Sequence, residues 1–181
     1  MDAGGDRLIE PSSLHPSNVA VIREVYDSEY AHEAFAMELE RALDANVIVI
    51  VIEPNQLGDE TARWISVGNC LHKTAVISGF GALLSGLIWA DRPLICTPLG
   101  TLSLLCTGLY TVSWQFDPCV KYQVECDSRR LARLPGYQSA MASASPIVLV
   151  RKDDTKRKLV HCTVSLLSAA LCAYRIYHSI K

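Results

Sequence analysis

The stretch Thr74–Phe116, TAVISGFGALLSGLIWADRPLICTPLGTLSLLCTGLYTVSWQF, decides the fold. It contains two long uncharged runs, residues 74–90 and 93–116, separated by a single charged pair, Asp91 and Arg92. At 1.5 Å per residue the runs reach about 25 Å and about 36 Å, against a hydrocarbon core of about 30 Å. The first run is short for a membrane span, and the second is long enough to cross with tilt. The stretch therefore predicts a two-span transmembrane hairpin; the alternative is a buried helix pair in a soluble domain.

Small residues recur at intervals of four on both runs. Such spacing lets helix backbones approach closely, and in lipid it is packing that drives helices together. It indicates self-association or packing on a partner helix, although membrane helices are rich in glycine in any case. The helix-packing candidates are Ser78, Ala82, Gly86, Gly81, Ser85, Cys96 and Gly100.

The segments that flank the hairpin carry opposite charge. Residues 1–73 hold five Lys and Arg against thirteen Asp and Glu, whereas residues 115–158 hold nine against five. A hairpin brings both segments to the same side of the membrane, where their attraction favours one shared domain. The expected fold class is therefore an α+β membrane protein: a two-span hairpin, a small α/β domain built from both flanking arms, and a C-terminal amphipathic or membrane-associated helix.

This architecture divides the 181 residues into consecutive segments. We expect a disordered arm over 1–18, the first half of the small domain over 19–73, the hairpin over 74–116, the second half of the domain over 117–158, and an amphipathic or third membrane helix over 159–181.

Local patterns predict the elements of the small domain. VIVIVI at 47–52 consists entirely of β-branched residues, so it predicts the central strand of a sheet. The amphipathic pattern of 29–45 predicts a helix, and Asp59 is a candidate N-cap for a helix over 59–73 that continues toward the membrane. Further strands are expected within 19–26, 120–125 and 146–150.

The C-terminal segment has a narrow polar stripe. At 100° per residue, His161, Ser165, Ser168, Cys172 and Arg175 fall on one face of an otherwise apolar helix. An isolated lipid-exposed span is not expected to carry such a stripe. These five residues are the interaction candidates of the chain. The pattern favours a helix that lies in the membrane interface or docks on a partner, and a third span is the alternative.

The residues that carry chemistry form no recognisable catalytic motif. Cys70 and His72 suggest a metal or redox site, with Cys119 and Cys126 as further members, but a zinc site needs three or four ligands at suitable spacing. We therefore expect no enzyme, no catalytic or metal-binding residues, no cofactor and no small-molecule substrate. A small Cys/His redox or metal-dependent membrane enzyme is the rival hypothesis. Nucleic acid is excluded as an expected partner because no basic stripe alternates with aromatic residues.

Three blocks of sequence carry a family resemblance: GDETARWISVGNCLHKTAV at 58–76, SWQFDPCVKYQVE at 113–125 and PIVLVRKDD at 146–154. Together with the strand IVIEP at 50–54, they resemble the transmembrane protein 11 family of mitochondrial membrane proteins. The resemblance runs from about residue 20 to the C-terminus. It is weakest in the N-terminal arm and inside the hairpin.

This resemblance implies a function that the residues alone do not. It implies a non-enzymatic, multi-pass protein that controls mitochondrial morphology and crista organisation through protein contacts. The implied location is the mitochondrial inner membrane, with the outer membrane as the alternative. The implied partners are membrane lipids and subunits of the crista-junction organising complex. The absence of a cleavable targeting signal at the start of the chain agrees with internal targeting.

Overall fold

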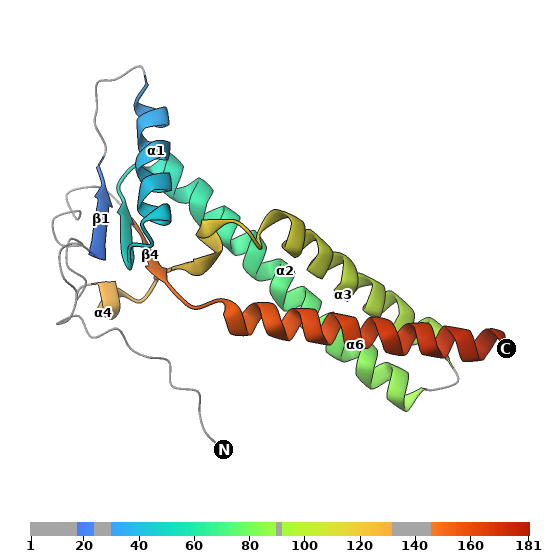
Figure 1. Cartoon of the computed structure of the whole chain (residues 1–181). Coiled ribbons are helices and arrows are strands. Elements are labelled where there is room, and N and C mark those ends of the chain that lie inside the picture. The colour runs from blue at the N-terminus through green and yellow to red at the C-terminus, as the bar shows by residue number, and fades with distance from the viewer. Residues whose placement is uncertain (1–17, 24–29, 90–91, 132–145) are drawn as a thin grey trace. The chain divides into compact units, whose positions relative to one another are not determined.

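A computed structural model describes residues 18–23, 30–89, 92–131 and 146–181 (Figure 1). The expected disordered arm lies outside these residues, apart from Asn18. The elements, in chain order, are β1 (Val19–Ile22), α1 (Ala31–Asp44), β2 (Val49–Ile52), α2 (Asn55–Ile88), α3 (Pro93–Ser113), the 3-10 helix η3 (Pro118–Lys121), β3 (Tyr122–Val124), α4 (Ser128–Leu131), β4 (Ile147–Arg151) and α6 (Thr155–Ile180).

The chain forms two compact units, and the boundary between them falls inside α2. The first, the sheet unit, comprises residues up to 62 and residues 122–152. The second, the helix unit, comprises residues 63–121 and 153–181. Each unit is therefore assembled from two separate stretches of the chain.

The sheet unit is built around β2. The strand order is β1-β2-β4-β3; β1 runs parallel to β2, while β4 is antiparallel to both β2 and β3. The parallel pair needs a crossover connection, which α1 provides. All four residues of β2 are buried, so the predicted central strand is confirmed.

Polar contacts fix the ends of the strands. The hydroxyl of Tyr122, a fully buried side chain, donates a hydrogen bond of 2.6 Å to the carbonyl oxygen of Val47. At the end of α1, Asn46 adopts a φ of 53°, a left-handed conformation that Asn tolerates and that commonly ends helices. The Arg151 guanidinium donates to the carbonyl oxygen of the same Asn46.

Most predicted elements appear with shorter bounds. The helix expected over 29–45 is α1, and the strands expected within 19–26, 120–125 and 146–150 are β1, β3 and β4. The prediction of Asp59 as an N-cap is wrong, because α2 begins at Asn55. Pro54 stands directly before this start, where its missing N–H costs no helical hydrogen bond.

Three helices within the described ranges are long and apolar enough to cross a membrane: α2, α3 and α6. The predicted first span is the C-terminal half of α2, and the predicted second span is α3. The protein is thus mostly helical, with a small sheet and three candidate spans.

Removing the side chain of Leu149, which is 0% exposed on β4, should destabilise the sheet unit. Leu149→Ala is expected to lower the free energy of unfolding by about 2–5 kcal/mol, because it leaves a cavity. Met37→Ala on α1, where the side chain is 63% exposed, is the matched control and should change it by less than about 0.5 kcal/mol. The measurement is the urea dependence of proteolysis of the detergent-solubilised chain. Equal midpoints for the two variants would contradict this packing.

Candidate functional site

The polar stripe of α6 lies inside the helix unit. His161, Ser165, Ser168 and Cys172 are all buried. Their neighbours on α3 follow in reverse order, so α6 runs antiparallel to α3, and the two ribbons lie side by side in Figure 1. We call the interior line of polar groups the polar seam; it comprises His72, Ser103, Thr107, Tyr110, His161, Ser165, Ser168 and Cys172.

Ser165 is at the centre of the seam. Its hydroxyl lies 2.8 Å from the hydroxyl of Ser103 and 2.6 Å from that of Thr107. Ser103 also donates to the carbonyl oxygen of Ala75 on α2, at 2.7 Å. A chain of hydrogen bonds therefore joins all three helices. Since Ser103 and Ser165 are both 0% exposed, these bonds do not compete with water.

A pair of histidines continues the seam toward the start of α6. The Nδ1 atoms of His72 and His161 are 3.1 Å apart, so one must carry a hydrogen and the other must accept it. The ring of Tyr110 meets that of His161 edge-on, with centroids 4.7 Å apart. The Tyr110 hydroxyl is buried and has no hydrogen-bond partner. The cluster is thus aromatic and polar, with one unsatisfied oxygen.

Close backbone approach completes the seam near the start of α3. The Cys172 thiol donates to the carbonyl oxygen of Cys96 at 3.4 Å. A Cβ at Gly100 would stand 2.7 Å from the Cys172 sulfur, and one at Gly79 would stand 2.5 Å from the Val164 side chain. Both glycines are therefore needed for the helices to approach this closely.

The sequence-predicted packing residues mostly face this interior. Six of the seven are buried, and Gly81 is half-buried. A Cβ at Gly86 would meet Leu171 of α6 and Cys96 of α3. Ser78 and Ser85 donate to carbonyl oxygens of their own helix. The structure thus uses these residues within one chain, and their role in self-association stays a prediction.

Four of the five predicted interaction residues on α6 also contact this chain's own helices, as members of the seam. Arg175 lies beyond them and is half-buried. Its guanidinium carbon lies 6.0 Å from the Tyr174 ring centroid, and its Nε is buried with no hydrogen-bond partner. Arg175 is therefore the member of the stripe that the described helices leave unsatisfied.

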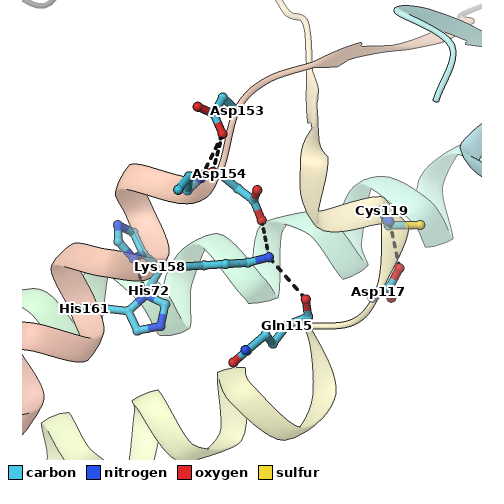
Figure 2. A network of polar contacts seen from close by, with 9 residues as sticks. His72, Gln115, Asp117, Cys119, Asp153, Asp154, Lys158 and His161 are labelled. Atoms are coloured by element: carbon cyan, nitrogen blue, oxygen red, sulfur yellow. Dashed lines mark hydrogen bonds and ion pairs between the residues drawn. The ribbon is translucent and has the colours of Figure 1, made fainter.

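A second set of polar contacts surrounds the other end of the helix unit. We call it the polar collar; it comprises Trp64, Asn69, Trp114, Gln115, Asp117, Asp154, Arg157 and Lys158. Figure 2 shows Lys158 between the Asp154 carboxylate and the backbone oxygen of Gln115, at 2.6 Å and 3.2 Å. Asp154 Oδ2 accepts no well-aligned hydrogen bond, so this pairing is mainly electrostatic. The Arg157 guanidinium donates to the side-chain oxygen of Asn69.

Two tryptophans complete the collar. Trp64 and Trp114 stack with ring centroids 4.3 Å apart. The Trp64 indole donates to Asp117 Oδ2 at 2.6 Å, and the Trp114 indole donates to the Trp64 carbonyl oxygen. Stacked, hydrogen-bonded tryptophans of this kind are typical of the membrane–water boundary.

Asp117 also affects the ionisation of the nearest thiol, that of Cys119. Its Oδ1 accepts a hydrogen bond from the backbone N–H of Cys119 at 2.8 Å (Figure 2). Burial, and then the adjacent Asp117 carboxylate, raise the pKa of the Cys119 thiol to about 12. A thiol that stays protonated at neutral pH is a poor nucleophile and a poor metal ligand. Among the described residues, no group of three or more His, Cys, Asp or Glu side chains is arranged to hold a metal ion.

Sequence reasoning named Cys96 and Gly100 on α3 as packing candidates but missed Ser103, Thr107 and Tyr110, the α3 members of the seam. Cys96, Gly100, Ser103, Thr107 and Tyr110 recur at alternating intervals of three and four, which is the spacing of one helix face. Four of them are small or polar in an otherwise apolar run. That periodicity was the available signal, and it matches the polar stripe already visible on α6.

Comparison with known proteins identifies the chain. A family model described as "Mitochondrial morphogenesis regulator" matches residues 18–177. The chain belongs to this family. Among its relatives are "Transmembrane protein 11 homolog, mitochondrial" of Drosophila melanogaster, 54% identical over 96% of this chain and 92% of the relative, and "Transmembrane protein 11, mitochondrial" of Homo sapiens, 48% identical over 97% and 91%. The protein of the same name in Danio rerio is 52% identical over 87% and 84%. No solved structure matches the chain.

The seam gives a direct test of the helix packing in this member of the family. Ser165→Leu removes two interhelical hydrogen bonds, each about 0.6 kcal/mol in a membrane protein, and overpacks a closed site at about 1–3 kcal/mol. The expected loss of stability is about 2–4 kcal/mol. Thr163→Leu, on an exposed position of the same helix, is the matched control and should be nearly neutral. The measurement is unfolding of the detergent-solubilised chain by SDS; equal loss in both variants would refute the seam.

The reactivity of Cys119 gives a test by pH. In a variant whose other exposed or half-exposed cysteines (Cys70, Cys126 and Cys162) are replaced by Ser, alkylation of Cys119 should stay slow until the pH approaches 12. Asp117→Asn removes the negative charge, so it should lower the pKa and speed alkylation at pH 9. Because folding raises this pKa, the contribution of Cys119 to stability is complete below the unfolded value of about 9 and is lost as the pH rises toward 12. The reference is a companion variant that keeps exposed Cys126 and has Ser at positions 70, 119 and 162. Alkylation of Cys119 at pH 8 as fast as that of Cys126 in this companion would contradict the burial.

Proposed function

We propose that this chain is a non-enzymatic, multi-pass protein of the mitochondrial inner membrane that controls mitochondrial morphogenesis and crista organisation through protein–protein contacts. The observation that carries the proposal is the family match over residues 18–177, whose description is regulation of mitochondrial morphogenesis. The relatives are named as mitochondrial transmembrane proteins, and three helices of this chain are suited to a membrane.

The proposal includes α2 and α3 as a transmembrane hairpin. Large apolar side chains on the outer faces of these helices support it, because in water they would be exposed at a considerable cost. On α2 and α3 they include Ile77, Phe80, Leu84, Leu87, Leu94, Leu102, Leu105, Leu109 and Val112.

The proposed partners are mitochondrial membrane lipids and subunits of the crista-junction organising complex, with self-association as a further contact. The sheet unit supports a role in protein binding because it combines a packed core with an acidic, solvent-facing helix. On α1 the exposed acidic residues are Glu33, Glu38, Glu40 and Asp44.

The rival enzyme hypothesis is tested by removing its chemistry. In cells that lack the endogenous protein, a variant with Cys70, Cys119 and Cys126 replaced by Ser and His72 replaced by Gln should restore mitochondrial shape and crista junctions to the wild-type level. His72→Gln keeps a side chain that can hydrogen-bond to His161. Loss of rescue at normal abundance, with normal thermal stability in detergent, would favour the enzyme and overturn the proposal.

The compartment is tested separately. Carbonate extraction should leave the chain in the membrane fraction, and a protease added to intact mitochondria should leave epitopes at both ends of the chain uncut. Rupture of the outer membrane should then expose whichever ends face the intermembrane space. Digestion of either epitope in intact mitochondria would place the protein in the outer membrane instead.

A further inference from the structure

The outer face of α6 is mostly apolar from Leu159 to Tyr177, with exposed Thr163 as an exception, while its inner face carries the polar seam. A helix of a soluble domain has the reverse arrangement. The large exposed apolar side chains of α6 are Leu159, Val160, Leu166, Leu167, Tyr174, Ile176, Tyr177 and Ile180.

We infer that α6 crosses the membrane as a third span, antiparallel to α3, with lipid acyl chains covering its outer face. Residues 159–174 contain no Asp, Glu, Lys or Arg, and at 1.5 Å per residue they reach about 24 Å. This length is close to that of the first predicted span, 74–90, and like it needs slight thinning of the bilayer or snorkelling of the flanking charges.

The contacts with α3 exclude a helix that lies flat in the interface. Lys158 meets Gln115 just beyond the end of α3, and Cys172 meets Cys96 in its first turn. From Cys96 to its end at Ser113, α3 extends over about 26 Å, and α6 extends over about 21 Å from Lys158 to Cys172. A helix that follows α3 over this distance must cross the bilayer if α3 does.

The polar stripe does not oppose this crossing, because most of its members are satisfied inside the chain. Ser165 bonds to two hydroxyls of α3, Ser168 bonds to a carbonyl oxygen of its own helix, and His161 meets His72. Groups with partners of this kind do not have to find water or lipid headgroups. The one charge on the stripe, Arg175, lies three residues beyond Cys172, where a long side chain can reach the interface.

Each end of the three-helix unit carries residues typical of a membrane boundary. The polar collar lies at the end where α6 begins. At the other end are Trp89 and Arg92 next to the turn of the hairpin, and Tyr174, Tyr177 and Lys181 at the end of α6; all five are exposed. Such belts of aromatic and basic residues mark the two interfaces of a bilayer. The C-terminus therefore emerges on the opposite side of the membrane from the collar.

The test compares two cysteine probes in the full chain. One variant keeps exposed Cys126, which follows α3 and η3; the other carries Ser179→Cys, near the end of α6. In both, the other exposed or half-exposed cysteines are replaced by Ser, and a variant with neither probe measures labelling of the buried ones. With a membrane-impermeant maleimide on sealed membranes, one probe should be labelled at once and the other only after detergent. Labelling of both probes under the same condition would overturn the third span.

A second measurement avoids cysteine substitutions and identifies what covers α6. In phosphatidylcholine vesicles that contain a photoactivatable acyl chain, the peptide with Leu166 and Leu167 should be modified as strongly as the α3 peptide with Leu104 and Leu105. Modification of α3 alone would show that acyl chains do not cover α6, and would overturn its assignment to them. The inference rests on the membrane location in the proposed function and not on the role in morphogenesis. The labelling pattern expected for a third span can therefore fail in a protein that still restores mitochondrial shape. It can also be obtained in a protein that does not restore it.

Discussion

The hydrogen bonds from Ser165 to Ser103 and Thr107 are the contacts on which the arrangement of the helix unit depends. Between apolar helices in lipid there is little hydrophobic driving force, so packing and a few polar contacts decide which faces meet. Sliding α6 along α3 by one residue would rotate Ser165 away from both hydroxyls. The seam thus fixes the register of α6 and the face that it turns inward.

The seam and the collar have different physical roles. Inside the unit, small residues and hydroxyls allow close backbone approach, as Gly79 and Gly100 show. At the collar, charged, amide and aromatic side chains connect the start of α6 and the end of α3 to the middle of α2. The unit is therefore polar along its axis and at its ends, and apolar on its outer faces. This distribution suits a surrounding of acyl chains bounded by two layers of headgroups.

The family match assigns the chain to regulation of mitochondrial morphogenesis. The described residues show which side chains are engaged inside the chain and which surfaces are exposed. Cys119 and His72, two of the side chains that the rival enzyme hypothesis relies on, make contacts inside the chain. The Cys119 thiol is held protonated by burial and by Asp117, and His72 is engaged with His161. What the chain offers to other molecules is surface: a small packed sheet with an acidic helix, and a bundle of helices with apolar outer faces.

The sequence by itself determined the elements. Six consecutive β-branched residues at 47–52 predict a buried strand in any context, and uncharged runs of membrane length predict spans, because both follow from local composition. It also showed the polar stripe of α6, but not what the stripe contacts. Only the tertiary structure decided that Ser165 meets Ser103 and Thr107, some 60 residues away. Many pairings of three apolar helices bury similar area, and the choice among them depends on hydroxyls and glycines that must align simultaneously on all three.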